Sequence, residues 1–282
     1  GAPWPRAAVC DDPSLAHARA PGAPAPIEQG GAASAPICDP MAELVCRAEA
    51  PADEAPVRPA RAIAAEGRIL DLPLDGFGPA VVAVPLGAQP PRPVVVAAHG
   101  NYDRPEWQCA EWADIVGDRA FVLCPRGVAR PDSPRGGEQR FTYRDGAALE
   151  REVAVGLAAL ARRFGADAAT DGELVWGGFS WGAILGVGIA RGAPARYPRL
   201  VLVEGGHDPW TAAAAHAYAA AGGKRVLFVC GSMGCVHAAV PPAARLAASG
   251  VAIKIELADG MGHGYGGRAS RLVASDLAWL LE

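Results

Sequence analysis

Residues 174–186, LVWGGFSWGAILG, place a serine where a short apolar run gives way to a segment rich in small residues. The apolar run has the character of a buried strand, and residues 181–192 are predicted to form a helix. A tight turn from strand to helix strains the serine backbone, and the flanking Gly178 and Gly182 lack side chains that would clash there. In this context the G-x-S-x-G pattern predicts that Ser180 is a nucleophile, the alternative being a serine that packs in a glycine-rich turn.

Apolar runs alternate with predicted helices through the rest of the chain. The six runs lie at residues 93–100, 119–127, 172–178, 199–206, 224–231 and 251–260. Continuous Val, Leu and Ile strands are typical of a parallel sheet that helices cover on both faces. Two earlier runs, RILDLPL at 68–74 and AVVAVPL at 80–86, flank a glycine-containing turn and predict a hairpin. Together the runs predict an α/β fold with an eight-stranded, mostly parallel sheet.

The longest predicted helix lies between Asp145, its expected N-cap, and Gly165, where it should end. Its apolar residues recur at spacings of four, four and three, which places them on one face. These residues are Leu149, Val153, Leu157 and Leu160.

Residues 1–62 differ in composition from the remainder of the chain. They are rich in alanine and proline, a composition that buries little surface and disfavours both helix and sheet. The sequence therefore predicts an N-terminal arm or linker with little regular structure at 1–62, and a catalytic domain at 67–282.

The overall charge and hydropathy exclude two classes of partner. A net charge of −4 offers no concentrated basic face for nucleic acid or an anionic membrane surface. No apolar run approaches the roughly 20 residues that a membrane-spanning helix needs. We therefore expect no nucleic-acid partner and no membrane span.

Seven cysteines raise the question of the cellular compartment. Six of them form three local pairs and one is left over: Cys38 with Cys46, Cys109 with Cys124, Cys230 with Cys235, and Cys10. Such pairs predict disulfides and a secreted or periplasmic protein, with reduced cysteines in a cytoplasmic enzyme as the alternative. The first residues show no signal-peptide pattern, so this expectation rests on the cysteines. The spacings differ from those of structural zinc sites, and no metal site is expected.

A general base should come after the nucleophile, in the loop that follows the last strand. The segment ELADGMGHGYGG places His263 there, between two glycines. Three other histidines also lie near strand ends, namely His99, His207 and His237. Chain order and loop position therefore single out His263.

An oxyanion hole needs two preorganised backbone N–H groups. The first is expected from Trp181, the residue after the nucleophile, and the second from the loop after the third strand. That loop, HGNYD at 99–103, offers the amide of Asn101, with Tyr102 as the alternative. His99 is expected to orient neighbouring groups rather than to act as a base.

The motifs HGNYD, GFSWG and GMGHGY, in this order, resemble the α/β-hydrolase superfamily. The resemblance is to the esterase and peptidase-like branches related to dienelactone hydrolases and prolyl oligopeptidases, and it covers about residues 67–282. It implies the α/β-hydrolase fold, Ser180 as nucleophile, His263 as base, and Trp181 and the Asn101 loop as oxyanion donors. A serine hydrolase of this kind needs no metal or organic cofactor.

The chain departs from the family at the acid of the triad. Most members carry an acid after the seventh strand, but the corresponding segment, 228–239, contains neither Asp nor Glu. Three substitutes remain open. Glu204 is favoured because it ends a buried strand, whereas Asp208 is also a candidate N-cap for a helix near Trp210, and Asp259 resembles a turn residue. A Ser–His dyad without an acid is a further alternative. If a disulfide closes the CGSMGC segment, this closed loop would have replaced the loop that usually carries the acid.

The polar segment 129–146 is expected at the carboxyl edge of the sheet, where a crevice would open. Candidate pocket residues are His99, Tyr102, Trp107, Phe141, Tyr143, Phe179 and Trp181, and the candidate cations for an acidic substrate group are Arg126, Arg140 and Arg144. The favoured function is cleavage of a small-molecule or peptide-like ester, less so of an amide. The alternatives are a serine peptidase, a non-catalytic binding protein on the same fold, and a metallohydrolase that uses His99, His207, Asp208 and His263.

Overall fold

A computed structural model describes residues 68–85, 91–135 and 138–282 of the chain. The predicted arm at 1–62 lies outside the described residues, and so do Cys10 and the predicted Cys38–Cys46 pair.

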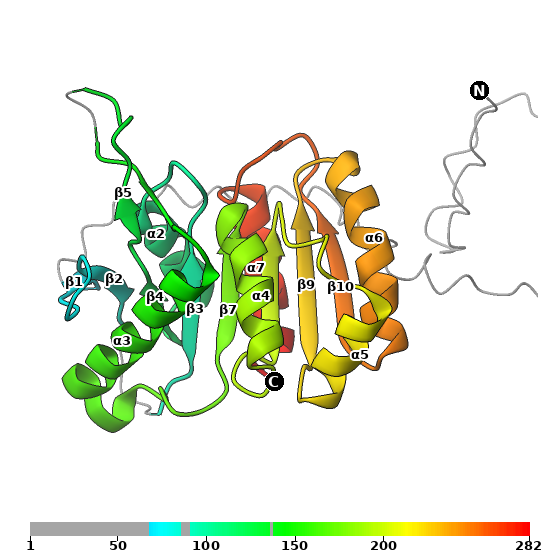
Figure 1. Cartoon of the computed structure of the whole chain (residues 1–282), viewed down its shortest axis with the longest axis horizontal. Coiled ribbons are helices and arrows are strands. Elements are labelled where there is room, and N and C mark those ends of the chain that lie inside the picture. The colour runs from blue at the N-terminus through cyan, green and yellow to red at the C-terminus, as the bar shows by residue number, and fades with distance from the viewer. Residues whose placement is uncertain (1–67, 86–90, 136–137) are drawn as a thin grey trace, which may run out of the picture. The chain divides into compact units, whose positions relative to one another are not determined.

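Eight strands form one sheet in the order β1-β2-β4-β3-β7-β8-β9-β10 (Figure 1). Their bounds are β1 Ile69–Leu72, β2 Ala80–Ala83, β3 Val94–Ala98, β4 Phe121–Cys124, β7 Val175–Phe179, β8 Arg199–Val203, β9 Arg225–Cys230 and β10 Ala252–Leu257. Strand β2 is antiparallel to both β1 and β4, and every other pairing is parallel. The prediction of a mostly parallel eight-stranded sheet that begins with an antiparallel hairpin is confirmed.

The crossover order brings distant loops together at one edge of the sheet. Strand β3 pairs with β7, with Ala98 opposite Gly178, so the chain segments that follow these two strands emerge side by side. Strand β9 lies between β8 and β10, so the loop after β9 emerges between the other two. The carboxyl ends of the parallel strands, uppermost in Figure 1, therefore gather the loops that the sequence marked as chemically important.

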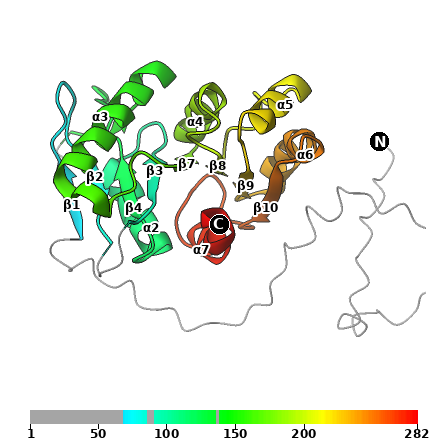
Figure 2. The same ribbon diagram turned by 90° about the horizontal axis from the view of Figure 1, so that it is seen from below.

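Helices cover both faces of the sheet, as expected (Figure 2). One face carries α3 Gly146–Phe164, α4 Trp181–Gly192, α5 Ala212–Ala220 and α6 Met233–Ala248, and the other carries α2 Pro105–Val116 and α7 Arg268–Leu281. Among the helices of the described residues, none combines the length and apolar character that crossing a membrane would require.

Two hydrophobic cores lie on the two sides of the sheet. Successive residues of β3 alternate between them: Val94 and Val96 pack with the α3–α6 side, and Val95 with the α2 and α7 side. All of β3 is buried, because both faces are covered. This explains why the central strands are continuous apolar runs rather than alternating patterns.

Helix α3 has the predicted ends. The Asp145 side chain accepts a hydrogen bond from the backbone N–H of Ala148, and Gly165 follows the helix with a φ of 58°. The four apolar residues predicted to share a face are all buried: Leu149, Val153, Leu157 and Leu160.

The described residues contain two disulfides at the predicted pairs. Cys109 and Cys124, with Cα atoms 5.8 Å apart, connect α2 to β4. Cys230 and Cys235, with Cα atoms 5.4 Å apart, connect the end of β9 to the first turn of α6. The two cross-links thus join a strand to the helix that packs beside it in each case.

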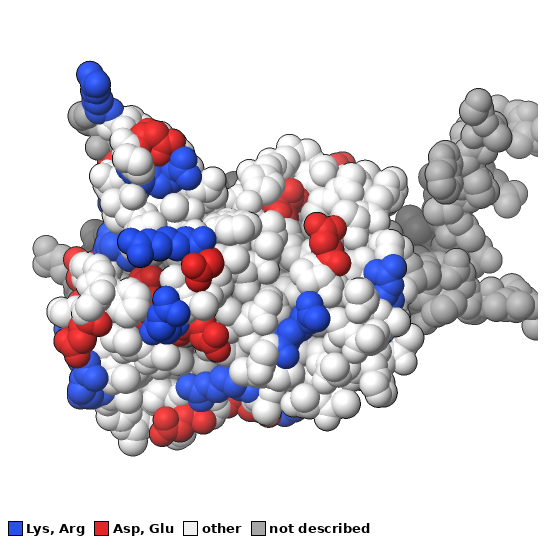
Figure 3. Space-filling model, in the orientation of Figure 1, with Lys and Arg blue, Asp and Glu red and all other residues white. Residues whose placement is uncertain are grey.

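The segment predicted as a polar insertion contains a two-stranded antiparallel ribbon that the residue pattern did not predict. Its strands are β5 Val128–Ala129 and β6 Phe141–Thr142. Figure 1 shows the ribbon at the carboxyl edge of the sheet, on the β4 side. Figure 3 shows acidic and basic side chains interspersed on the face that carries α3 to α6, without a broad patch of one sign.

Two glycines of α4 provide a matched test of helix packing. A Cβ at Gly186 would lie 1.9 Å from Nε1 of Trp176, whereas a Cβ at Gly188 would meet nothing within 4 Å. We expect Gly186→Ala to lower the free energy of unfolding by about 1–3 kcal/mol through overpacking. Gly188→Ala should raise it by about 0.5–1 kcal/mol, since alanine favours the helix. Urea unfolding of both variants measures the two effects, and equal shifts would contradict the packing of α4 on Trp176.

Candidate active site

Ser180 occupies a strained turn between β7 and α4. Its backbone has φ 49° and ψ −111°, a region that residues other than glycine rarely adopt. A Cβ at Gly178 would lie 2.6 Å from the backbone N of Ala183, and one at Gly182 would lie 2.3 Å from the carbonyl O of Ala98. The tight packing of this turn therefore requires glycine on both sides of Ser180.

Backbone strain in the described residues gathers at this edge of the sheet. In the described part of the chain, only three non-glycine residues have a positive φ: Tyr102 at 61°, Ser180 at 49° and Glu204 at 52°. Each follows a different strand of the sheet. Such strain persists where the surrounding structure imposes it, and it is concentrated at functional sites in many proteins.

A continuous hydrogen-bonded chain joins the serine to a histidine and a carboxylate. Nε2 of His263 lies 2.9 Å from Oγ of Ser180, and Nδ1 lies 3.2 Å from Oε2 of Glu204. In a neutral imidazole with this geometry, Nδ1–H donates to Glu204 and Nε2 accepts the hydrogen bond of the Ser180 hydroxyl. The His263 side chain is 58 % exposed, so the imidazole between Ser180 and Glu204 is open to solvent.

The Glu204 carboxylate is held from two sides. Its side chain is 9 % exposed, and Oε1 accepts a hydrogen bond from the backbone N–H of Gly231. The backbone N–H of Glu204 donates to the carbonyl O of Val229, 3.0 Å away. The carboxylate is therefore oriented toward His263 by groups at the end of the neighbouring strand.

The other two candidate acids lie elsewhere. Asp208 and Asp259 are exposed, and no hydrogen bond or ion pair joins either to His263 in the described part of the chain. The interpretation of Asp208 as an N-cap is wrong, because α5 begins at Ala212 and the Thr211 side chain caps it. The Thr211 hydroxyl accepts from the N–H of Ala214, one helical turn later.

The predicted oxyanion donors flank Ser180. Trp181 is the first residue of α4, so its backbone N–H has no partner within the helix. A Cβ at Gly100 would lie 3.5 Å from Cβ of Ser180, which brings the segment after β3 against the serine. Asn101 follows directly and is exposed. The positive dipole end of α4 and the loop after β3 thus face the same space.

The ribbon holds the loop after β3 in place. Asp103 and Phe141 exchange backbone hydrogen bonds, of 3.3 Å and 2.8 Å. The Arg130 guanidinium donates to Oδ1 of Asn101 at 2.8 Å, and the Tyr102 hydroxyl donates to the carbonyl O of Asp132 at 2.9 Å. The insertion therefore fixes the segment that carries Asn101.

Two residues predicted to line the pocket instead support the loop from below. His99 is fully buried, with Nδ1 2.7 Å from the carbonyl O of Gly100 and Nε2 3.0 Å from that of Arg126. Burial lowers the pKa of His99. The Tyr143 ring stacks on His99, and its hydroxyl accepts from the His99 backbone N–H and donates to Pro125. Burial also raises the pKa of Tyr143, and both side chains are buried beneath the loop.

The other predicted pocket residues differ in their exposure and contacts. Tyr102 and Trp107 are exposed large side chains, whereas Phe141 is buried. Phe179 is buried and packs against His263, with ring centroids 5.0 Å apart. Trp181 is half-buried and its indole donates to the carbonyl O of Tyr143. Phe179 therefore supports the His263 ring, and Trp181 connects the start of α4 to the segment that contains Tyr143.

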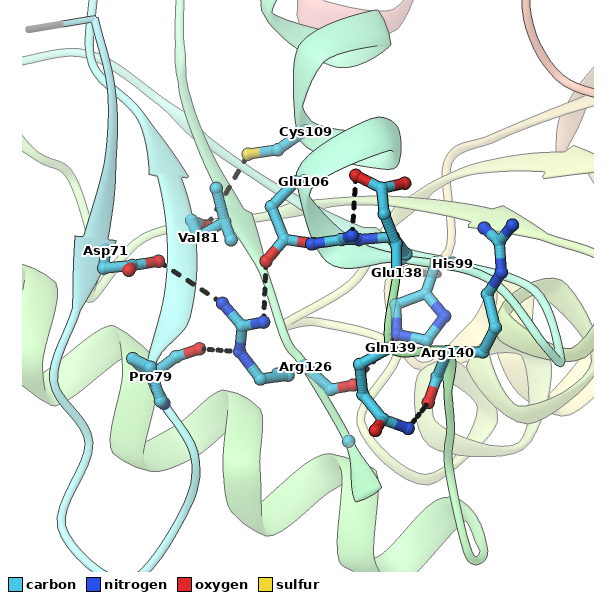
Figure 4. Close-up of polar contacts among 12 residues, drawn as sticks. Asp71, Pro79, Val81, His99, Glu106, Cys109, Arg126, Glu138, Gln139 and Arg140 are labelled. Carbon is cyan, nitrogen blue, oxygen red and sulfur yellow. Dashed lines mark hydrogen bonds and ion pairs between the residues drawn. The ribbon is translucent and has the colours of Figure 1, made fainter. Parts of the chain in front are cut away.

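The three arginines have different surroundings. Arg126 does not face a substrate, because it pairs with Glu106 at 2.6 Å and Asp71 at 3.3 Å and donates to Pro79 (Figure 4). Arg140 stacks over Trp107 at 4.1 Å, and its guanidinium extends away from Gln139 (Figure 4). Arg144 is exposed. Of the three candidate cations, Arg126 is therefore held by two acidic side chains and the carbonyl O of Pro79.

The residue pattern did not single out Asp103, Tyr265 or Gly231, yet all three connect the loops of the site. Oδ1 of Asp103 accepts from the Tyr265 hydroxyl at 3.2 Å, and Oδ2 accepts from the N–H of Gly100. The Tyr265 ring packs 4.7 Å from that of Phe179, and burial raises the Tyr265 pKa. The available signals were the position of Tyr265 two residues after His263 and the acidic end of the HGNYD motif.

The four residues of the metallohydrolase alternative are not arranged as a group of metal ligands in the described residues. Both ring nitrogens of His99 face carbonyl oxygens. In the described ranges, the one group with spacing suited to a metal consists of His207, Cys230 and Cys235. Two of these three donors are joined in a disulfide and are therefore not free thiolates.

Comparisons with known proteins identify solved structures that resemble this one. No protein-family model and no curated protein sequence matches the chain. Solved structures do resemble it, among them TT1662 from Thermus thermophilus, at a TM-score of 0.57 and 17 % identity over 76 % of this chain and 98 % of that one. A candidate dienelactone hydrolase from Klebsiella pneumoniae matches at a TM-score of 0.52 and 18 % identity, over 76 % and 97 % of the two chains. A thermostable esterase matches at 0.51 and 15 %, over 76 % and 62 %.

The likenesses agree with the strand order described above. The sheet begins with antiparallel strands, β4 lies between β2 and β3, and the remaining strands are parallel, with helices on both faces. The described residues therefore have the α/β-hydrolase fold that the motifs predicted.

Proposed function

We propose that the protein is a serine hydrolase that cleaves a carboxylic ester through an acyl-enzyme. The observation that carries the proposal is the unbroken hydrogen-bonded chain from Glu204 through His263 to Ser180, which ends at a strained elbow. Three residues from three separate loops meet in the order that nucleophilic catalysis requires.

The first half of the reaction forms the acyl-enzyme. Oγ of Ser180 attacks the ester carbonyl while Nε2 of His263 takes the hydroxyl proton. Glu204 stabilises the imidazolium that results and keeps Nδ1 protonated. His263 then donates the proton to the leaving alkoxide, and the carbonyl forms again as the alcohol departs.

The second half returns the enzyme to its starting state. A water molecule attacks the acyl carbonyl, and His263 now accepts a proton from that water. Collapse of the tetrahedral intermediate breaks the bond to Ser180 Oγ, which recovers its proton from His263. In both halves the backbone N–H groups of Trp181 and Asn101 hold the negative oxygen.

An ester is favoured over an amide as the substrate. One structural neighbour is named as an esterase and another as a candidate dienelactone hydrolase. The two disulfides favour an oxidising compartment, so a secreted or periplasmic location is part of the proposal.

The function is tested with a fluorophosphonate probe and a panel of p-nitrophenyl esters and aminoacyl anilides. We expect stoichiometric labelling of the purified protein and turnover of short-chain esters faster than of anilides. Faster turnover of anilides would favour the peptidase alternative. Absence of both labelling and turnover would overturn the proposal and favour a binding protein on this fold.

The ribbon gives a further prediction, at Arg130. Replacing Arg130 by alanine removes the 2.8 Å hydrogen bond to the Asn101 side chain and loosens the segment that carries one oxyanion donor. We expect kcat to fall about tenfold, less than the roughly 10²–10³-fold loss of a donor removed outright. Arg144→Ala is the matched control, because Arg144 is exposed and makes no contact with Asn101 in the described residues. Equal kcat values for the two variants would contradict this role of the ribbon.

A further inference from the structure

The loop closed by the Cys230–Cys235 disulfide lies between the acid and the base of the site. It follows β9, and β9 lies between β8, which precedes Glu204, and β10, which precedes His263. Neighbouring strands are about 4.8 Å apart, so the acid and the base belong to strands about two spacings apart. The loop after β9 fills the interval between them.

A single residue of this loop contacts both sides. The backbone N–H of Gly231 donates to Oε1 of Glu204, and its carbonyl O accepts from the N–H of Gly262 at 3.1 Å. Gly262 directly precedes His263. The peptide groups of Gly231 thus connect the carboxylate to the segment that carries the imidazole.

The close approach requires glycine at position 231. A Cβ there would lie 2.0 Å from the carbonyl O of Gly262, closer than real Cβ atoms come to other atoms. Any larger residue would therefore displace the loop that positions His263. Backbone atoms are well suited to this task because they carry a donor and an acceptor at fixed geometry.

The disulfide fixes both ends of the loop. Cys230 is fully buried at the end of β9, and its carbonyl O accepts from the N–H of Ala258 at 2.7 Å. Cys235 lies in the first turn of α6 and is half-buried. The intervening residues, Gly231 to Gly234, are therefore confined between a sheet strand and a helix, which reduces the freedom of Gly231.

We propose that the disulfide-closed loop 230–235 is a positioning element, in which Gly231 holds Glu204 and the His263 loop in register and the Cys230–Cys235 bond holds Gly231. The inference rests on the proposed function. The proposal also accounts for the absence of an acid from the loop after β9, because this loop orients Glu204, which follows β8, and carries no carboxylate of its own.

The proposal predicts that cleavage of this disulfide impairs catalysis. A dithiol reductant transfers two electrons, gives one hydrogen to each cysteine sulfur and is itself oxidised to a disulfide. Cys235 is the accessible partner, whereas Cys109 and Cys124 are both fully buried. A loosened Gly231 would weaken its hydrogen bond to Glu204 and thereby the Glu204–His263 contact.

The test compares two double variants, Cys230→Ala/Cys235→Ala and the control Cys109→Ala/Cys124→Ala. We expect Cys230→Ala/Cys235→Ala to lower kcat about ten- to a hundredfold with KM nearly unchanged. A loss of this size is expected when one hydrogen bond to a charged group is missing in the transition state. The control should keep kcat within about twofold of the parent. Circular dichroism of both variants establishes that each is folded.

A double-variant cycle separates positioning from general loosening. Glu204→Gln should cost much less in the Cys230→Ala/Cys235→Ala background than in the parent, because the carboxylate is already out of register there. Equal costs in the two backgrounds, or an unchanged kcat without the disulfide, would overturn the inference. Ser180-dependent fluorophosphonate labelling of the parent would still support the proposed function in that case.

A second measurement does not depend on turnover. The Nδ1–H of His263 donates to Glu204, and such protons give a resolved low-field resonance in proton NMR spectra. We expect this resonance in the parent and in Cys109→Ala/Cys124→Ala, and its loss in Cys230→Ala/Cys235→Ala and in Gly231→Ala. Its persistence in the last two variants would contradict the positioning role whatever the substrate.

Discussion

Ser180→Ala is expected to abolish fluorophosphonate labelling and to lower kcat by about 10⁶-fold, with any remaining rate due to binding and the oxyanion donors alone. In the proposed mechanism Oγ of Ser180 forms the acyl-enzyme, and it lies 2.9 Å from Nε2 of the His263 imidazole. Alanine keeps the strained turn, since it adds no atom beyond the existing Cβ. The measurement is ester turnover under saturating substrate, together with mass spectrometry of the labelled protein.

Ser275→Ala is a suitable control for this prediction. The Ser275 hydroxyl is exposed and donates to the carbonyl O of Leu272 within α7, and it has no contact with Ser180 or His263 in the part of the chain that the structure describes. We expect it to be labelled like the parent and to change the free energy of unfolding by at most about 0.5 kcal/mol. Labelling that survives in Ser180→Ala would show that another residue is the nucleophile.

Glu204→Gln is expected to lower kcat by about 10⁴-fold with little change in folding. The glutamine oxygen can still accept from the N–H of Gly231, so the side chain keeps its place. Its amide NH₂, however, is directed at Nδ1 of His263 and favours the tautomer with the proton on Nε2. That tautomer cannot accept the proton of Ser180, which explains the large loss.

Asp208→Asn and Asp259→Asn are the matched controls for the acid. Both side chains are exposed, and in the described residues neither contacts His263, so kcat should stay within about twofold of the parent. A near-parental rate for Glu204→Gln combined with a large loss in Asp208→Asn or Asp259→Asn would transfer the role of acid to that residue. Near-parental rates in all three variants would favour a Ser–His dyad.

Much of the fold follows from short-range signals. The continuous Val, Leu and Ile runs predict buried parallel strands, and Asp145 and Gly165 mark the ends of α3, because strand burial and helix capping depend on neighbouring residues. The ribbon β5–β6 escaped prediction because its strands have only two residues each and lie in a polar segment. Such short pairings are stabilised by the contacts of Asp103 with Phe141 rather than by their own pattern.

Some residues of the candidate site could likewise be predicted from the sequence, and others could not. Chain order and local motif suffice to predict Ser180 and His263, because an elbow between a strand and a helix and a loop after the last strand have recognisable local composition. The pocket residues His99 and Tyr143 were misplaced, since the residue pattern does not say on which side of a loop an aromatic ring packs. Their burial beneath the loop depends on the path of a segment more than 40 residues away.

The sequence by itself determined the strands, the helices and the turn that carries Ser180, because each depends on residues close together along the chain. Only the tertiary structure decided which carboxylate meets His263. Glu204, Gly231 and Gly262 belong to loops after three adjacent strands, and strand order and register bring them within hydrogen-bonding distance. Three candidate acids could be named from composition, but a hydrogen bond between residues 59 positions apart depends on how the whole sheet is assembled.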